Sequence, residues 1–327
     1  MSKKQLKFMD FCSGIGAARV ALENLGLKCV AHSEINEKAD ETYKLFFGNN
    51  DKNFGDLMKI NPKELPDFDI MIAGFPCQTF SIAGKRKGFQ DPRGTIIYGL
   101  IEILKAKKIK YFILENVKGL LNVDGGRTLQ TILHELMHAG YDVRRKLVNS
   151  MEYGVPQMRE RIYFVGVRSD LGIDANKFSF ENINKKQANI SNFLINNDEE
   201  FVFSPDKPAY KTFINYLNNK YNKDKYSLNK LLKTNYIILD TRQSDLRIYE
   251  DKVPTLRTGR HGIMYIKDGQ LRKLSGQEAL LLQGFPNKLA KPAQEKLNNT
   301  NLLSQAGNAM TVNAIQFLGN QLLKIIK

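Results

Sequence analysis

Tryptophan is absent from this 327-residue sequence, and cysteine is scarce, with thiols only at Cys12, Cys29 and Cys77. An odd number of cysteines without a Cys-x-x-Cys pair argues against a disulfide framework and against a cysteine zinc site. No apolar run approaches the ~20 residues that span a bilayer, and the start MSKKQLKFMDF lacks the apolar core of a signal peptide. The sequence therefore predicts a cytoplasmic protein with reduced thiols and no membrane segment.

Acidic residues are outnumbered in this chain. Lysine and arginine total 49 against 34 aspartates and glutamates, which gives a formal net charge of +15 at pH 7. Such an excess favours a polyanionic partner, because neutralising phosphates releases condensed counterions. Nucleic acid is the leading candidate, although many proteins from lysine-rich proteomes are basic without binding it. The charge supports a nucleic-acid partner without deciding the question.

Short apolar runs alternate with helical periodicity through the first half of the chain. Helices are expected to begin near Ala17 and Glu37. Strands are predicted near residues 6–11, 29–32, 68–73, 110–114, 143–149 and 161–167. This alternation is typical of a mostly parallel sheet covered on both faces, and ligands bind such sheets at the carboxyl ends of their strands. The chain is long enough for this α/β domain and a second, smaller one.

The segment DFCSGIGAARVALENLG places a glycine turn between the first strand and a helix. Gly14 and Gly16 would let backbone N–H groups approach a ligand, and Glu34 after the second strand could accept from ribose hydroxyls. Arg19 occupies the third glycine position of the dinucleotide fingerprint, which favours a smaller nucleoside such as S-adenosylmethionine. Asp56 follows a further expected strand and could reach the adenine. An ordinary turn is the alternative for both segments.

A lone cysteine stands in GFPCQTFSIAG, directly after an apolar strand. Cys77 is either a buried small hydrophobe at a turn or a nucleophile whose pKa is lowered by nearby cations. The following loop carries Lys85 and Arg86 among glycines and is basic enough to close over a phosphate backbone. Glu115 and Asn116 follow the next apolar strand, so a carboxylic acid is expected to face the same cleft as the thiol.

A thiolate, a carboxylic acid and a methyl donor together suit methylation of cytosine at C5. Attack by Cys77 at C6, with Glu115 hydrogen bonded to N3 and the amino group, would produce an enamine able to take a methyl group. Loss of the C5 proton and expulsion of the thiol would complete the reaction. A stacked base is out of reach, so the target nucleotide must leave the duplex at a cost of about a few kcal/mol.

With these residues in place, the sequence resembles the cytosine C5 DNA methyltransferases of bacterial restriction-modification systems. The similarity keeps the same order along nearly the whole chain. It is carried by the segments DFCSGIG, SEINEKA, GD, GFPCQTFSIAGKRKGFQDPRGT, LENVKGL, YGVPQMRER, LRKLSGQEALLLQGFP and QAGNAMTVNAI. Any one of them could arise by chance, but together and in this order they are highly specific.

The resemblance implies roles for residues along the chain. Cys77 is the expected nucleophile, Glu115 is expected to engage the base, and Arg159 and Arg161 are expected to orient it. Residues expected to line the S-adenosylmethionine site or hold it together are Cys12, Gly14, Gly16, Glu34, Ile35, Asp56, Leu57, Phe75, Pro76, Ile96 and Asn308. Residues expected to contact DNA are Ser81, Lys85, Arg86, Arg242, Thr255, Arg257 and Arg260.

Two positions depart from the family pattern. Cys12 stands where phenylalanine is usual, and Ile35 stands where some members have tryptophan. Aromatic packing on the adenine is therefore in question, although other residues could complement its shape. No chemical role is assigned to the Cys12 thiol.

The segment HELMH matches the H-E-x-x-H zinc pattern. On a helix, Leu129, Ile132 and Leu136 form an apolar stripe, which places His134 and His138 on the solvent side. No third ligand is evident in the sequence, so no metal site is predicted.

The strand–helix alternation fades beyond about Ser169. Lysines and tyrosines intermingle from Phe201 to Asn235, a mixture suited to phosphates and bases, although a solvated lysine-rich surface is the commoner meaning. By resemblance this region is a target-recognition domain, in which Arg242 and Arg257 are among the arginines able to read guanine. The expected organisation is a catalytic domain at 1–180, a target-recognition domain at 181–271, a hinge at 272–300 and a C-terminal helix at 301–327 that returns to the catalytic domain.

The predicted fold is thus α/β, a Rossmann-like S-adenosylmethionine-dependent methyltransferase sheet with a smaller target-recognition domain. The predicted enzyme is a DNA (cytosine-5)-methyltransferase that acts as a monomer on double-stranded DNA in the bacterial cytoplasm, where a cognate restriction endonuclease could act on the same site. A tRNA cytosine-5 methyltransferase is the first alternative. A catalytically silent DNA-binding regulator is the second.

Overall fold

The computed structural model describes residues 5–76, 96–182, 188–259 and 261–326. The chain divides into two compact units. Unit 1 comprises Met1–Asn149, Glu160–Asn184 and Ala309–Lys327, and unit 2 comprises Ser150–Arg159 and Lys185–Asn308. Within the described ranges, no helix combines the length and the apolarity needed to cross a bilayer.

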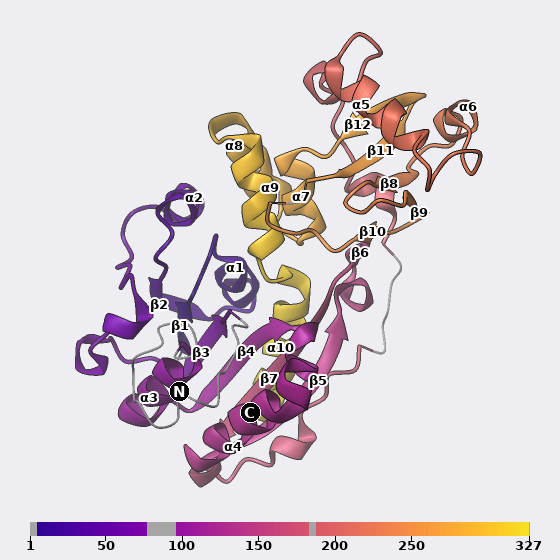
Figure 1. Ribbon diagram of the computed structural model, residues 1–327. Helices are drawn as coiled ribbons and strands as arrows, with labels where there is room; N and C mark the ends of the chain where they lie inside the picture. The colour runs from indigo at the N-terminus through magenta and orange to yellow at the C-terminus, as the bar shows by residue number, and fades with distance from the viewer. Residues whose placement is uncertain (1–4, 77–95, 183–187, 260, 327) are drawn as a thin grey trace. The chain divides into compact units, whose positions relative to one another are not determined.

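Unit 1 is built on a six-stranded sheet of order β2-β1-β3-β4-β7-β5 (Figure 1). Its strands are β1 (Lys7–Phe11), β2 (Lys28–Ser33), β3 (Ile70–Gly74), β4 (Tyr111–Val117), β5 (Tyr141–Asn149) and β7 (Glu160–Arg168). All of them were predicted from the apolar runs, with small shifts at their ends.

The sheet is mixed, whereas the sequence suggested a mostly parallel one. β1 to β4 pair in parallel, but β7 runs antiparallel to both β4 and β5. No crossover helix separates β5 from β7, and strands joined without a crossover pair antiparallel. The strand expected before Asp56 is also absent, because the chain there makes only an isolated bridge between His32 and Asn53.

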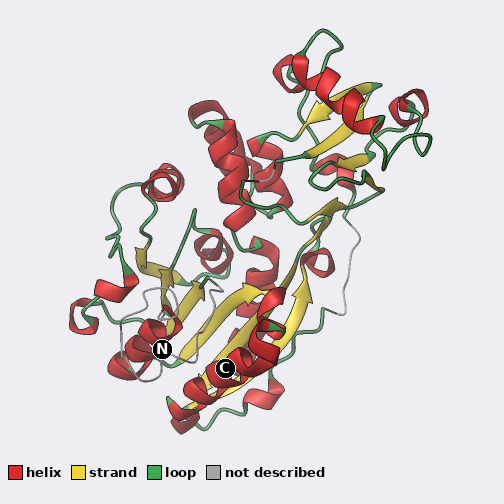
Figure 2. Cartoon of the chain, in the orientation of Figure 1, coloured by secondary structure: helices red, strands yellow, loops and turns green. Residues whose placement is uncertain are grey.

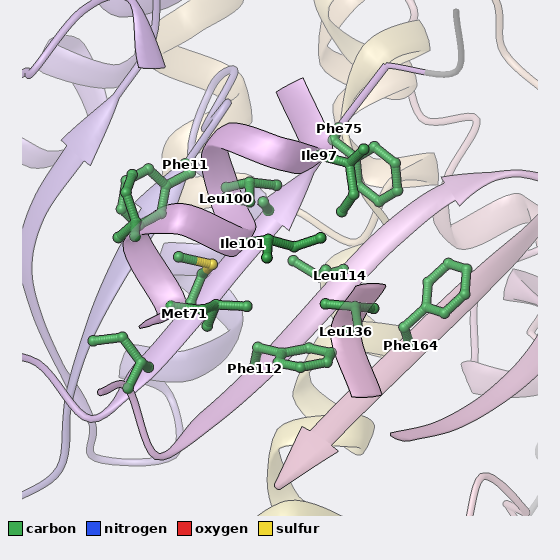
Figure 3. Packing of buried hydrophobic residues seen from close by; sticks show 14 of the residues in the cluster. Phe11, Met71, Phe75, Ile97, Leu100, Ile101, Phe112, Leu114, Leu136 and Phe164 are labelled. Atoms are coloured by element: carbon green, nitrogen blue, oxygen red, sulfur yellow. The ribbon is translucent and has the colours of Figure 1, made fainter. Parts of the chain in front are cut away.

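Helices cover the sheet of unit 1 on both faces (Figure 2 shows helices red and strands yellow). They are α1 (Ala17–Glu23), α2 (Glu37–Phe47), α3 (Ile96–Lys107), α4 (Arg127–His138) and α10 (Val312–Ile325). Side chains of α3 and α4 join Phe11, Met71 and Phe112 in one buried cluster (Figure 3). The alternate residues Ile70 and Ile72 point to the other face and are also buried, so neither face is open to water.

The HELMH segment lies in α4. Leu129, Ile132 and Leu136 are buried, while His134 and His138 are exposed, as the helical spacing predicts. No group of three potential metal ligands is found among the residues that the structure describes.

Unit 2 contains a four-stranded antiparallel sheet of order β12-β11-β8-β9. Its strands are β8 (Ile238–Asp240), β9 (Arg247–Tyr249), β11 (Ile263–Lys267) and β12 (Gln270–Lys273), and a separate parallel pair joins β6 (Gln157–Met158) to β10 (Val253–Pro254). Its helices are α5 (Pro208–Leu217), α6 (Leu228–Leu232), α7 (Gly276–Leu282), α8 (Asn287–Lys296) and α9 (Asn299–Asn308).

The tyrosines of the lysine-rich region contribute to the core of unit 2. Tyr210, Tyr216 and Tyr226 pack partly buried against the apolar cluster formed by α5, α6 and the sheet. Tyr221, by contrast, is 46% exposed. The mixture of lysine and tyrosine therefore reflects packing for the first three tyrosines and leaves the exposed lysines as the candidates for phosphate contact.

Gly166 in β7 offers a test of the packing in the core of unit 1. It pairs with Phe112 of β4, and a Cβ at Gly166 would overlap the Phe112 ring, which is fully buried. We expect Gly166→Ala to lower the free energy of unfolding by about 1–3 kcal/mol, because overpacking forces buried side chains off their rotamers. Denaturant unfolding followed by circular dichroism measures the effect. Gly119→Ala is the control, since its Cβ would lie 3.8 Å from Val117, and an equal loss of stability in both variants would contradict the explanation.

Candidate active site

The glycine turn after β1 has a left-handed backbone. Cys12 has φ 49°, Gly14 has φ 55° and Gly16 has φ 82°. A Cβ at Gly16 would lie 2.9 Å from the Tyr43 ring and would also strike Phe47, so packing against α2 excludes a side chain there. A Cβ at Gly14 would meet nothing within 4 Å. Gly14 thus leaves an open space above the turn, as a backbone that receives a ligand requires.

Glu34 follows β2 and is tied to this turn. The backbone N–H of Gly14 donates to Glu34 Oε2 at 2.7 Å, and that of Asn36 donates to Oε1 at 2.8 Å. A carboxylate oxygen has two lone pairs, so each oxygen can accept a further hydrogen bond. Because Glu34 is only half-buried, a ligand with two neighbouring hydroxyls could supply those donors.

Asp56 lies in the neighbouring connection. Its carboxylate accepts from the backbone N–H of Met58 at 3.0 Å and is half-buried. Ser33, at the end of β2, donates its hydroxyl to the carbonyl of Gly55 at 2.7 Å. The structure therefore brings the segments that carry Glu34 and Asp56 together at the carboxyl end of β2.

The apolar residues expected around the cofactor differ in exposure. Ile35 is 72% exposed beside Glu34, whereas Leu57 is buried in the core. Burial, together with the nearby Glu34 carboxylate, raises the pKa of the half-buried Cys12 thiol to about 12. Cys12 is therefore a neutral thiol at pH 7, which agrees with a packing role.

Arg19 lies in α1 and forms a buried network. Its guanidinium donates to Asp51 at 2.5 Å and to Glu23 at 2.9 Å, and it lies 4.4 Å from the centre of the Phe47 ring. These contacts bind α1 to α2 and to the connection after it. Arg19 is thus occupied in the scaffold.

Asp10 is a site feature that sequence reasoning missed. It is fully buried in β1, and neither carboxylate oxygen has a partner at hydrogen-bond geometry among the described residues, although the backbone of Arg19 approaches it. Burial, and secondarily the charge of Glu34, raise the pKa of Asp10 well above its usual range. The signal was present in the sequence as one acid within the otherwise apolar strand segment FMDF.

Glu115 and Arg161 meet at the end of β4. Arg161 Nε lies 3.2 Å from Glu115 Oε1, an ion pair without hydrogen-bond geometry, and both side chains are largely buried. Arg161 is the second residue of the antiparallel strand β7 and pairs with Val117 of β4. A Cβ at Gly74 of β3 would lie 3.7 Å from Glu115 Oε2, so the small residue leaves room beside the acid.

Two hydrogen bonds hold the segment that leads to residue 77. The backbone N–H of Phe75 donates to the Glu115 carbonyl at 3.2 Å, and Asn116 Nδ2 donates to the Phe75 carbonyl at 3.0 Å. Phe75 is buried, whereas Pro76 is exposed. The chain therefore leaves β3 against the Glu115–Asn116 backbone.

Ile96 begins α3 and is half-buried against the core. The predicted site residues that lie outside the described residues are Cys77, Ser81, Lys85, Arg86 and Arg260.

Arg159 belongs to unit 2 and is 1% exposed. Its Nη1 donates to the Gly307 carbonyl at 3.1 Å and to the Leu256 carbonyl at 3.4 Å. A Cβ at Gly307 would lie 2.6 Å from the backbone of Arg257, so the helix α9 packs closely on this loop. Gly307 lies in the last turn of α9.

The same loop is held by two hydroxyls. Thr255 Oγ1 donates to the Met158 carbonyl at 2.5 Å, and Thr258 Oγ1 donates to Asn308 Oδ1 at 2.5 Å. Residues 255–258 are therefore fixed by β6 on one side and by α9 on the other.

The arginines expected to contact DNA differ in availability. Arg242 donates to both carboxylate oxygens of Asp240, at 2.7 and 2.8 Å, and to the Thr255 carbonyl at 2.7 Å. Its side chain is 6% exposed. Arg257, in contrast, is exposed. The structure thus gives Arg242 a scaffold role and leaves Arg257 accessible.

A known protein family matches this chain along most of its length. The family model for C-5 cytosine-specific DNA methylases matches residues 6–324. The chain is 37% identical over 328 residues to the type II methyltransferase M.BsuFI of Bacillus subtilis, covering 95% of this chain and 71% of the relative. It is 32% identical over 332 residues to the type II methyltransferase M.HhaI of Haemophilus parahaemolyticus, covering 96% of this chain and 93% of the relative.

Solved structures share the fold. A putative DNA modification methyltransferase encoded within an E. coli prophage matches with a TM-score of 0.72 at 18% identity, covering 98% of this chain and 99% of that one. The Dnmt2 methyltransferase of S. pombe matches with a TM-score of 0.70 at 18% identity, covering 99% of this chain and 100% of that one.

The family match spans almost the whole sequence, and its relatives exceed 30% identity over most of their length. The chain therefore belongs to the C-5 cytosine-specific DNA methylase family and is a methyltransferase enzyme.

Proposed function

We propose that this enzyme methylates C5 of a cytosine swung out of duplex DNA, through a covalent bond between Cys77 and C6. The observation that carries the proposal is the buried pair of Glu115 and Arg161, beside the two hydrogen bonds, from the Phe75 N–H and from the Asn116 side chain, that anchor Phe75 two residues before Cys77. An acid, a cation and the approach to the thiol thus share one strand edge, as pyrimidine addition chemistry requires.

The residues at the β1 and β2 ends fit S-adenosylmethionine. The half-buried Glu34 carboxylate keeps a free lone pair on each oxygen for the ribose hydroxyls, and Asp56 can accept from the adenine amino group. The open space above Gly14 admits a close ligand, and Ile35 offers an exposed apolar surface. When bound, S-adenosylmethionine supplies an electrophilic methyl group.

The chain's own residues prepare the base. The Cys77 thiolate adds to C6, which forms a C6–S bond and places electron density on C5. Glu115, as the carboxylic acid, donates its O–H to N3 and accepts from the amino group, which stabilises the negative charge that develops on the ring. After C5 has gained its methyl group, a solvent base takes its proton, the electrons of the C–H bond restore the C5–C6 double bond, and the C6–S bond breaks to return the thiolate. Arg161, whose Nε lies 3.2 Å from Glu115 Oε1, holds the Glu115 carboxyl group in place.

We propose that unit 2 reads the target sequence. Support comes from the exposed Arg257 on a loop fixed by Thr255, Thr258 and Arg159. A rigidly mounted arginine can bond guanine in bidentate fashion. Exposed lysines of residues 207–233 would contribute sequence-independent phosphate contacts.

The oligomeric state, the location and a partner enzyme are part of the proposal. We propose a monomer that works on duplex DNA in the bacterial cytoplasm, because one flipped base occupies one active site. A cognate restriction endonuclease for the same site is inferred from the type II methyltransferases among the relatives.

A side-by-side assay separates the proposal from its alternatives. Tritiated S-adenosylmethionine is offered with duplex DNA of mixed sequence or with bulk tRNA. We expect label in DNA cytosine and none in tRNA, because the family match is to DNA methylases. Label confined to tRNA would favour the tRNA enzyme, and binding of DNA without any label would favour the silent regulator.

Cys77→Ala tests the covalent step. We expect methyl transfer to fall on the order of 10⁴-fold or more while DNA binding is retained, because the nucleophile is removed and the binding surface is kept. Initial rates and gel-shift affinities measure the two effects. Cys29→Ala is the matched control, since Cys29 is a buried thiol in β2.

Covalent capture gives a second readout. Duplex DNA with 5-fluorocytosine at the target should form a denaturant-resistant adduct with the wild type and none with Cys77→Ala, because fluorine at C5 blocks loss of the proton. Full activity of Cys77→Ala, or an adduct that persists in it, would overturn the assignment.

Salt dependence tests the lysines of unit 2. We expect neutralising the exposed Lys211, Lys220 and Lys223 to glutamine to reduce the slope of log K against log salt by about 0.9 for each of these lysines that binds a phosphate. Fluorescence anisotropy across a salt series measures the slope. The control is a second triple variant, in which three exposed lysines of unit 1 are changed to glutamine: Lys63, Lys105 and Lys108. Equal slopes in the two triple variants would mean that the unit 2 lysines do not contact phosphates and belong only to the solvated surface.

A further inference from the structure

We propose that Asn53 is a positioning residue that sets the spacing between the ribose acceptor Glu34 and the adenine acceptor Asp56, and so tunes affinity for the adenosine part of the cofactor. The inference rests on the proposed function and deepens it. Asn53 belongs to none of the motifs that predicted the site.

The side chain of Asn53 makes three hydrogen bonds to two segments. Its Oδ1 accepts from the backbone N–H of Glu34 at 3.0 Å and from that of Gly55 at 2.8 Å. Its Nδ2 donates to the Glu34 carbonyl at 3.0 Å. An amide side chain has two acceptor sites and two donors, so only one donor is left over. Asn53 therefore holds the backbone of Glu34 through both its N–H and its carbonyl.

These bonds replace a missing strand. Residues 48–56 contribute no strand to the sheet, and their backbone bonds to β2 are those of one isolated bridge, from the His32 N–H to the Lys52 carbonyl at 3.2 Å and from the Phe54 N–H to the His32 carbonyl at 2.8 Å. Beyond this bridge, the position of Gly55 and Asp56 relative to β2 depends on side chains. Asn53 supplies one bond to Gly55, and the Ser33 hydroxyl supplies the other at 2.7 Å. A small set of bonds thus fixes the second cofactor acceptor.

The Glu34 carboxylate is oriented from the opposite direction. Gly14 and Asn36 donate to its two oxygens, while Asn53 holds its backbone. The position of this acid is therefore defined from both ends of the residue. Removal of the Asn53 amide releases the backbone of Glu34. It leaves three backbone groups without this partner, namely the N–H and the carbonyl of Glu34 and the N–H of Gly55.

Asparagine is needed here because both an acceptor and a donor are used. An aspartate would set an oxygen against the Glu34 carbonyl and would add a negative charge beside the Glu34 carboxylate. An alanine would remove all three bonds. Both changes should act on the nucleoside end, because the side-chain bonds of Asn53 within the described ranges go to Glu34 and Gly55 and not to the acid at the base site, Glu115.

Asn61 provides a matched control. Its Oδ1 accepts from the backbone N–H of Lys63 at 3.1 Å, two residues ahead, just as Asn53 accepts from Gly55. Asn61 lies in the same connection between β2 and β3, and its side chain bonds Lys63 and Glu64, not Glu34, in the part of the chain that the structure describes. Asn61→Ala therefore removes a comparable local turn bond without touching the bonds that hold Glu34.

The experiment measures binding separately from turnover. Isothermal calorimetry gives Kd for S-adenosylmethionine and for S-adenosylhomocysteine in the wild type, Asn53→Ala, Asn53→Asp and Asn61→Ala. Steady-state assays give kcat and KM for the same proteins, and thermal unfolding without ligand reports the fold.

We expect Asn53→Ala to raise Kd about 10-fold or more, equally for both ligands, because they share the adenosine part whose acceptors Asn53 positions. Asn53→Asp should weaken binding at least as much. The kcat at saturating cofactor should stay within about twofold of the wild type, since only binding is affected. Asn61→Ala should leave Kd within about twofold, and both variants should unfold well above the temperature of the binding assay, so that a change in Kd is not a loss of folded protein.

Several results would overturn the proposal. They are an unchanged Kd in Asn53→Ala, full affinity in Asn53→Asp, or a fall in kcat at saturation with Kd intact. Should Asn53→Ala fail to fold, Asn53→Ser, which keeps an oxygen for the Gly55 N–H, tests the same bonds to Glu34. If the wild type binds neither ligand, the proposed function itself is wrong. If the wild type binds both ligands and Asn53→Ala binds them equally well, only the proposed role of Asn53 is wrong.

Discussion

The parallel pairing of β1 to β4 is the constraint on which the site depends. Phe11 pairs with Ser33 on one side and with Ala73 on the other, and Ala73 pairs with Leu114. These four residues form one row across the sheet, so β1, β2 and β3 end within one residue of the same level, and Glu115 lies one residue beyond the row in β4. Neighbouring strands are ~4.8 Å apart, which separates Glu34 after β2 from Glu115 in β4 by roughly 14 Å. The edge thus runs from Glu34, past Phe75 and Pro76, to Glu115, the residues on which the proposed function depends.

The direction of β7 completes this edge. Arg161 lies near the start of its strand, and in an all-parallel sheet the start of a strand lies at the opposite edge from the ligands. Because β7 is antiparallel, its start meets the end of β4, and Arg161 reaches Glu115. Apolar runs and their spacing predicted where this strand lies, but periodicity carries no information on strand direction. The YGVPQMRER segment identified Arg161 as a candidate site residue, but only the antiparallel direction of β7 explains how its side chain reaches Glu115.

Local signals were sufficient to predict the turn at Gly14 and Gly16, because two glycines between a strand and a helix are visible in the sequence. Asn53 gave no such signal, since one asparagine in a polar connection resembles any other. Arg159 and Arg242 resembled exposed ligand-binding arginines, yet each is buried against backbone carbonyls. For Arg242 a clue existed: Asp240, two residues earlier, is spaced to lie on the same side of an extended chain. The partners of Arg159, in contrast, lie about a hundred or more positions away and follow only from the fold.

The electrostatics of the β1 end follow from the same arrangement. Two acids, Asp10 and Glu34, lie near each other there, and two adjacent negative charges would repel. The structure resolves this by burial: Asp10 is enclosed and its raised pKa favours the neutral acid, while Glu34 stays half-buried with two backbone N–H donors. Of the two acids, Glu34 is therefore the one that a ligand can reach.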